Sequence, residues 1–399
     1  MLGAPASILG MKTEHVWRLG LRLTTKLREH IPAYLGTYLI VTILLAITSQ
    51  SAIAAGLTIY LDPVGDDDNN GLSVSEPVLT LSRAQEIAWS EHPDLAEDID
   101  IVVRPGVYYG QEVVWNYFPV GKILRILPAG FTPRANCNSV TQTCWPTTSA
   151  GMPRFEANGA TKPFIEINAT ESGQQTNVKI YGLFINHYRY AISLQKNEGS
   201  TIAECYFRNI GSQQQTGAED GPTTTLLMTN SSYNLIRYNF FRNNGNFVVV
   251  GDPGLDAEQE ENEQRKFHAV YMSDFSTYNT IDSNNLSHIS GHAIKVRNAS
   301  GYNWVVNNRI FNVTYGTAFQ DYYHGTNEQP SFENHFEDNR LVSNGASLIG
   351  LELYRPLNTC INRDPPYVQR VFVENNYGSK RANDIIFGAG GSPNQWTCN

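Results

Sequence analysis

The residues best suited to chemistry in this chain are a lysine and an arginine two positions apart, Lys295 and Arg297. Side chains two residues apart in a strand project from the same face of the sheet, so we expect both on one surface. A neighbouring like charge disfavours protonation of a lysine, which biases Lys295 toward a proton-accepting form. The pair therefore suits proton abstraction beside a guanidinium that binds an anion. A solvated pair without a chemical role is the alternative, since outward basic residues usually face water.

An internal repeat predicts how this pair is positioned. Residues 267–274 and 291–298 match at an offset of 24, and both segments carry a histidine at the second position, His268 and His292. Apolar residues two apart should point into a core: Val270, Met272, Ile294 and Val296. Their alternating neighbours should share the outward face: Tyr271, Ser273, Lys295 and Arg297. We expect the two histidines to stack as a structural pair.

Similar short sequence segments recur from about residue 163 onward, separated by turns rich in Asn, Gly and Ser. Successive turn asparagines lie 23, 31 and 37 residues apart: Asn285, Asn308, Asn339 and Asn376. A base period near 23 with insertions is typical of a stacked solenoid, in which identical residues form ladders. These repeated segments are short and rich in β-branched and aromatic residues, which favours strands. The spacing fits neither leucine-rich repeats nor a propeller.

The segment 55–162 is expected to hold an N-terminal cap and the first coils. Two strands are predicted at residues 57–61 and 99–103, with an amphipathic helix over 80–92 between them. Cysteine spacing does not suit a zinc site. We instead expect disulfides Cys137–Cys144 and Cys360–Cys398, with Cys205 buried as a small apolar residue.

Residues 1–54 resemble an export signal, because a basic stretch, an uncharged apolar run and a small-residue site follow one another. An uncleaved membrane anchor is the alternative. Without these residues the chain carries 24 Lys and Arg against 36 Asp and Glu, a net charge of −12. That surface disfavours nucleic acid or anionic lipid as the main partner. We expect a secreted, periplasmic or cell-surface protein that meets a membrane only through such an anchor.

Three stretches resemble the right-handed parallel β-helix superfamily of pectate lyases, alginate and chondroitin lyases and mannuronan epimerases. They are the turn-rich entry 60–73, the strand exit 104–109 and the repeats of 163–378. The resemblance covers most of the chain after residue 54. It implies an all-β, single-stranded right-handed parallel β-helix with an N-terminal capping α-helix. No motif singles out one lyase family, because this fold carries several chemistries.

The resemblance also implies a substrate class, an acidic polysaccharide, and a reaction, β-elimination at a uronate. This reaction needs the sugar carboxylate neutralised and a base at the C5 proton. We assign the base to Lys295, the carboxylate clamp to Arg297, and the proton donor to Tyr271 or His292. Further substrate contacts are predicted at Ser273, Tyr322, Tyr323, Glu352 and Arg355.

An acidic insertion, 251–266, precedes this stripe and is predicted to be a loop on the wall of a substrate groove. Its carboxylates at Asp252, Asp256 and Glu258 suit Ca²⁺, although an acidic loop is more often simply solvated.

Other functions stay open at this point. A C5-epimerase shares the proton abstraction. A glycoside hydrolase needs two opposed carboxylates, for which Asp321 and Glu352 are the candidates. A non-catalytic glycan-binding or surface protein is the remaining alternative. We expect a monomer.

Overall fold

The structure of this 399-residue chain is a computed structural model. It describes residues 56–91, 97–118, 121–134, 137, 143–169, 174–211, 224–246, 254–323, 328–343, 348–354, 359–361 and 369–387. The expected export signal or anchor, residues 1–54, lies outside them. Within the described residues, no helix combines the length and the apolar character needed to span a membrane.

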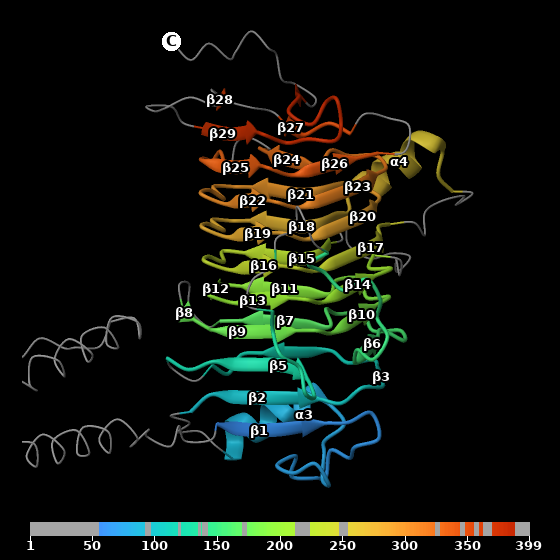
Figure 1. The fold of residues 1–399 in the computed structure, drawn as a ribbon, viewed down its shortest axis with the longest axis vertical. Coiled ribbons are helices and arrows are strands. Elements are labelled where there is room, and N and C mark those ends of the chain that lie inside the picture. The colour runs from blue at the N-terminus through green and yellow to red at the C-terminus, as the bar shows by residue number, and fades with distance from the viewer. Residues whose placement is uncertain are drawn as a thin grey trace, which may run out of the picture. The chain divides into compact units, whose positions relative to one another are not determined.

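Three parallel sheets run along the described part of the chain, and the chain visits them in turn (Figure 1). In spatial order the first sheet contains β1 (Leu57–Leu61), β2 (Ile99–Val103), β5 (Leu124–Pro128), β9 (Val178–Tyr181), β13 (Thr201–Ala203), β16 (Leu235–Arg237), β19 (Thr280–Asp282), β22 (Trp304–Val306), β25 (Asn334–Glu337), β29 (Gln369–Glu374) and β28 (Thr359–Ile361).

The second sheet contains β3 (Val107–Tyr109), β6 (Arg154–Glu156), β10 (Phe184–Asn186), β14 (Tyr206–Arg208), β17 (Phe240–Asn244), β20 (Asn285–Ile289), β23 (Arg309–Val313) and β26 (Arg340–Val342). The third contains β4 (Val113–Trp115), β7 (Ile165–Asn168), β11 (Ile192–Gln195), β15 (Thr224–Thr229), β18 (His268–Ser273), β21 (His292–Arg297), β24 (Phe319–Tyr322), β27 (Leu351–Tyr354) and β30 (Ile385–Phe387). A short pair, β8 (Gln174–Gln175) and β12 (Asn197–Glu198), lies beside them. One strand from each sheet makes one coil, and the coils form the predicted right-handed parallel β-helix.

The repeat predicted from sequence is the spatial repeat. His268 pairs with His292, and Val270 pairs with Ile294, between β18 and β21. Val270, Met272, Ile294 and Val296 are fully buried, as the alternation predicts. The ladder also begins well before residue 163, because β1, β2 and β5 pair in register and lead into β9. The segment 55–162 therefore contains the first coils.

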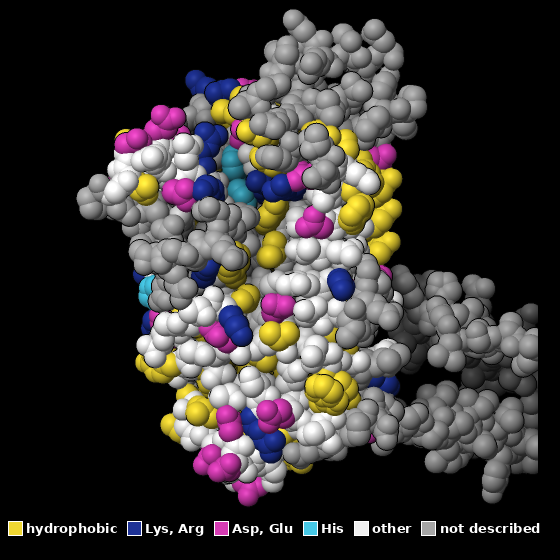
Figure 2. All heavy atoms as spheres, turned by 180° about the vertical axis from the view of Figure 1, so that it is seen from behind, with side chains coloured by type: hydrophobic (Ala, Val, Ile, Leu, Met, Phe, Trp, Pro, Cys, Tyr) yellow, Lys and Arg dark blue, Asp and Glu magenta, His cyan; other side chains and the backbone are white. Residues whose placement is uncertain are grey.

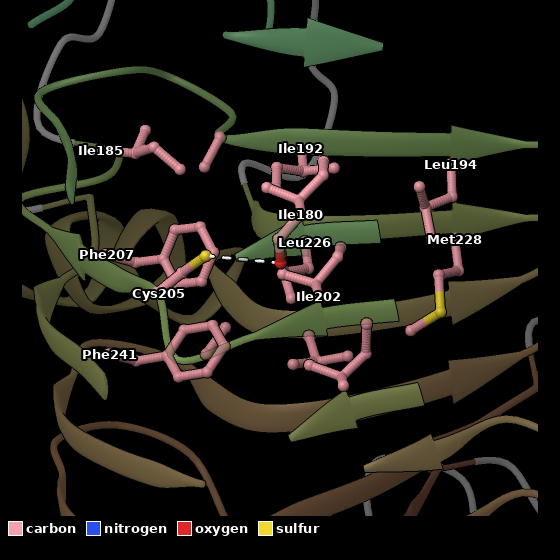
Figure 3. Close-up of a cluster of buried hydrophobic side chains, with 14 of the residues drawn as sticks. Ile180, Ile185, Ile192, Leu194, Ile202, Cys205, Phe207, Leu226, Met228 and Phe241 are labelled. Atoms are coloured by element: carbon pink, nitrogen blue, oxygen red, sulfur yellow. Dashed lines mark hydrogen bonds between the residues drawn. The ribbon is translucent and has the colours of Figure 1, made fainter. Parts of the chain in front are cut away.

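The core is a set of stacked apolar columns. Figure 3 shows Ile180 above Ile202, Phe207 beside Phe241, and Leu194 beside Met228, each pair contributed by successive coils. The rings of Phe207 and Phe241 stack with centroids 5.0 Å apart. Cys205 is fully buried among these side chains and is a free thiol, as predicted. Burial of one apolar side chain contributes about 1.5–3 kcal/mol, and each coil repeats that contribution.

Asparagine ladders connect equivalent turns of successive coils. In one ladder, the Oδ1 atom of each asparagine accepts both the backbone and the side-chain N–H of the preceding one, at 2.9–3.0 Å. It runs through Asn239, Asn284, Asn308, Asn339 and Asn376. A second ladder runs through Asn234, Asn279, Asn303 and Asn334. Both confirm that the turns carry asparagine ladders, but Asn284 takes the place expected of Asn285, which instead begins strand β20 and pairs with Arg309. The ladders satisfy backbone groups that the turns would otherwise bury unpaired.

A short helix, α3 (Leu81–Glu86), caps the first coil and continues into a π-helical turn at Ile87–Glu91. Thr80 is its N-cap, since the Thr80 hydroxyl accepts from the backbone N–H of Arg83. The apolar face predicted for this helix is fully buried against the core: Leu81, Ala84, Ile87 and Ala88.

The disulfide Cys137–Cys144 is present, with Cα atoms 5.6 Å apart. Cys144 packs with Trp145 and Tyr238, so the cross-link fastens its loop to the turn beside the second sheet. Cys398 lies outside the described part of the chain, so the Cys360–Cys398 bridge stays a prediction.

Removing one ladder asparagine should destabilise the whole coil stack. In the variant Asn308→Ala, the backbone N–H of Asn284 loses its buried acceptor, which costs about 1–3 kcal/mol. The free energy of unfolding, measured by urea denaturation, should fall by that amount. The matched control is Asn262→Ala, because Asn262 is exposed in helix α4 (Ala257–Arg265). Equal stability of the two variants would contradict a stabilising ladder.

Candidate active site on the third sheet

Four successive strands of the third sheet, β18, β21, β24 and β27, bring the predicted site residues together. Parallel pairing in register aligns Tyr271 with Lys295, Lys295 with Gln320, and Gln320 with Glu352. The next outward column aligns Arg297, Tyr322 and Tyr354. On the face opposite to that of Figure 1, histidine atoms lie in a hollow flanked by Lys and Arg side chains (Figure 2).

The side chain of Lys295 projects from the outward face of the sheet, as predicted. Neighbouring site residues cover it, so that only 8% of it is exposed. Its Nζ atom lies 4.0 Å from the ring centroid of Tyr322 and 5.4 Å from that of Tyr271. Burial, followed by the positive charge of Arg297, lowers the pKa of Lys295 to about 7. The carboxylates of Glu352 and Glu328 oppose this shift without cancelling it. Near neutral pH a large share of this lysine is therefore an unprotonated amine.

Arg297 is bound more tightly than a free carboxylate clamp would be. Its Nε atom donates to Glu328 Oε1 at 2.7 Å, and its Nη2 atom donates to the same oxygen. The guanidinium also lies 5.0 Å from the Tyr322 ring centroid and hydrogen-bonds to the Tyr271 side chain. Burial lowers the pKa of Arg297, but the contacts with Glu328 and Tyr271 together outweigh it and raise the pKa overall. Arg297 thus stays charged beside Lys295.

The two histidines lie next to each other as expected, with ring centroids 5.7 Å apart, but their rings are tilted by 36° and are not stacked. Burial, together with the charge of Lys295, lowers the pKa of both well below the ordinary value, so both rings are neutral. His292 Nδ1 accepts the backbone N–H of Thr317 at 3.1 Å, which leaves the proton on Nε2, 3.4 Å from Glu352. This assignment of the proton follows from the hydrogen bonds. Neither ring nitrogen of His268 has a hydrogen-bond partner among the described residues.

Glu352 is a buried carboxylate at the end of the column, 3% exposed. Gln320 Nε2 donates to its Oε2 atom at 3.0 Å. Arg265, the last residue of α4, places Nη2 at 3.8 Å from its other oxygen. Glu352 therefore interacts with His292, Gln320 and Arg265. The sequence analysis predicted Glu352 as a substrate ligand and did not predict these contacts.

The acidic insertion was expected to be a loop, but residues 257–265 form helix α4. Asp256 is its N-cap: its carboxylate accepts the backbone N–H of Gln259, whose side chain accepts from Asp256 in return. This capping box and the Glu- and Gln-rich sequence favour a helix. The expected Ca²⁺ ligand Asp256 is thus occupied in capping, Glu258 is exposed, and Asp252 lies outside the described residues. Among the described residues no group of three or more His, Cys, Asp or Glu could hold a metal ion.

The other expected residues are placed unevenly. Tyr322 stacks on Tyr354 at 4.5 Å and lies over Lys295, whereas Tyr323 joins Tyr354 only through the backbone. Ser273 is buried and bonds the Thr229 hydroxyl at 3.4 Å. Arg355 lies outside the described residues. Asp321 pairs with the core residues Val296 and Leu353, on the opposite side of the strand from Gln320 and Glu352. Asp321 and Glu352 therefore do not form the opposed pair that a hydrolase needs.

Sequence reasoning missed three members of the site: Glu328, Gln320 and Arg265. Glu328 lies 31 residues from Arg297, one coil further along the chain, so no local pattern predicts their contact. Gln320 was within reach, because the repeat that aligns Tyr271 with Lys295 extends to it one coil later. Arg265 was counted as part of a loop, and its position depends on the helix that ends there.

Comparisons with known proteins find distant structural matches. No family model and no curated protein matches this chain. Solved structures do match: an alginate lyase from Paenibacillus sp. (TM-score 0.45, 11% identity, 76% of this chain and 96% of that one), a rhamnogalacturonan lyase (0.41, 14%, 83% and 84%) and the pectate lyase Pel9A (0.39, 13%, 83% and 79%). Glycoside hydrolases match as well. With TM-scores below 0.5 and identities of at most 14%, these matches carry no argument about activity, which rests on the site.

The low pKa of Lys295 should appear as a pH dependence of stability. Between about pH 7 and pH 10.5 the unfolded chain holds a proton on Lys295 that the folded chain lacks, so unfolding becomes harder as pH rises. Below about pH 7 the folded state bears the full cost of the charge, up to about 5 kcal/mol. The variant Lys295→Met lacks this cost. Its free energy of unfolding should therefore be higher than that of the parent, with the largest difference at pH 6.5. The advantage should shrink toward pH 10.

Denaturant titrations of both proteins across this pH range measure the difference. Lys380→Met serves as the control, because Lys380 is exposed. A stability difference between Lys295→Met and the parent that does not change with pH would contradict a depressed pKa.

Proposed function

We propose that this protein is a polysaccharide lyase that cleaves an acidic, uronate-containing glycan by β-elimination. The observation that carries the proposal is the buried Lys295, whose pKa of about 7 makes its amine a base at neutral pH. A general base works best when its pKa lies near the working pH. Solvated lysines keep a pKa near 10.4 and are poor bases at neutral pH.

The elimination needs a proton taken from C5 of the uronate and a proton given to the departing glycosidic oxygen. Lys295 Nζ takes the first, and the C5–H electron pair forms the new double bond as the C4–O bond breaks. Tyr271 suits the second role, because burial raises the pKa of its hydroxyl and keeps it protonated. Arg297, which bonds this side chain, orients it and stabilises negative charge on the oxygen after transfer. His292 is less suited, since its one proton lies toward Glu352.

A C5-epimerase would begin with the same abstraction and then return a proton to the opposite face of the sugar carbon. The lyase is favoured because a tyrosine hydroxyl accompanies the amine in one column, where it can protonate a leaving group. Export to the cell surface or beyond would give the protein access to such glycans, in keeping with residues 1–54.

The full-length protein should release unsaturated uronate, detected by absorbance, from at least one of alginate, pectate and chondroitin. Assays run with CaCl₂ and with EDTA, so that a calcium requirement is also measured. The value of kcat/KM should rise through about pH 7 as Lys295 loses its proton. Lys295→Met should lower kcat by about 10²- to 10⁴-fold, the usual contribution of general acid–base catalysis.

The control is again Lys380→Met, which should keep parental activity. A lyase reaction that survives Lys295→Met would remove this lysine as the base. If none of the three glycans is cleaved in any condition, the proposed reaction fails for those substrates.

A further inference from the structure

Two arginines lie within this site, and their engagement differs. Arg297 uses Nε and Nη2 on Glu328 and also bonds Tyr271. The guanidinium of Arg265 makes no side-chain hydrogen bond to a described residue. Its ion-pair contacts, to Glu261 and to Glu352, are both 3.8 Å long. A guanidinium carries five N–H donors, so Arg265 has donors available for a ligand where Arg297 has few.

Arg265 and the proposed base act on the same histidine. Burial, followed by the positive charges of Lys295 and Arg265, lowers the pKa of His292, whose Nε2 atom lies 3.4 Å from Glu352. The side chain of Arg265 is 40% exposed, whereas that of Glu352 is 5% exposed. Arg265 is therefore accessible from solvent while it contacts the buried carboxylate of Glu352.

We propose that Arg265 is the residue that recognises the sugar carboxylate, and that it sets the preference of the site for uronates over neutral sugars. This inference rests on the proposed function. A planar guanidinium binds a carboxylate through two parallel hydrogen bonds. The neutralised carboxylate then stabilises the negative charge that develops when Lys295 removes the adjacent C5 proton.

Buried polar atoms without partners support a polar ligand at this place. Gln320 Oε1 and both ring nitrogens of His268 have no hydrogen-bond partner among the described residues. Each lies in a side chain at most 5% exposed. Leaving such groups unpaired costs free energy, and sugar hydroxyl groups would satisfy them when a uronate occupies the site.

Binding tests this role independently of turnover. In the full-length Lys295→Met background, calorimetry compares oligosaccharides of alginate, pectate and chondroitin with their carboxyl-reduced counterparts. The parent background should prefer the acidic form, and adding Arg265→Ala should weaken acidic binding by about 10- to 100-fold. Binding of the carboxyl-reduced form should change less than about 3-fold. Arg265→Lys should restore part of the preference, because it returns the charge without the planar pair of donors.

The matched control is Arg340→Ala, on the exposed edge strand β26 of another sheet, which should leave both affinities unchanged. Equal losses for acidic and reduced ligands, or no loss, would overturn the role of Arg265. So would the absence of any acid-preferring binding. If acidic oligosaccharides bind through Arg265 while no glycan is cleaved by the unmodified protein, the recognition stands and the lyase proposal fails.

In an active protein, kinetics gives a second readout. Arg265→Ala should lower kcat/KM on the free acid by about 10- to 100-fold and on its methyl ester by less than about 3-fold. An equal fall on both would indicate a structural role.

Discussion

Parallel pairing in register is the constraint on which the rest of this structure depends. Each coil lies directly on the previous one, so residues at equivalent positions form columns. In the interior the columns are apolar, and in the turns they are asparagines whose Oδ1 atoms accept from the neighbouring coil. Because a shift of one residue would exchange the buried and outward faces, the apolar columns and asparagine ladders together allow one register. That register also assembles the site, since Tyr271, Lys295, Gln320 and Glu352 come from four successive strands.

The chemistry of the site follows from placing a lysine in such a column. Aromatic rings and Arg297 cover Lys295, and their combined effect on solvation and charge makes the amine a base near neutral pH. The same stacking separates the two arginines by role. Arg297 is fixed by Glu328 and supports Tyr271, whereas Arg265 ends a helix and keeps its donors available. Thus one rigid sheet supplies the proton-transfer groups, and the insertion before β18 supplies the residue proposed to read the ligand.

What the sequence predicted was set by local periodicity. Alternation within 267–274 and 291–298 was enough to place Val270 in the core and Lys295 outward, because the strand period is fixed by backbone geometry. The asparagine ladders followed from the repeat. The helix at 257–265 was missed because its acidic residues were weighed as metal ligands and its capping box was not. The partner of Arg297, Glu328, could not be predicted, because a whole coil of 31 residues separates the two in sequence. The burial of Lys295 could not be predicted either, because it depends on the ring of Tyr322 from the next coil.

The most direct test of this account is a crystal structure of the full-length Lys295→Met variant with an acidic oligosaccharide bound. The account places one uronate over β18, β21 and β24, its carboxylate on the Arg265 guanidinium and its C5 hydrogen facing position 295. The glycosidic oxygen should lie within hydrogen-bond distance of the Tyr271 hydroxyl. A glycan bound on another face, or one whose carboxylate does not contact Arg265, would contradict the account.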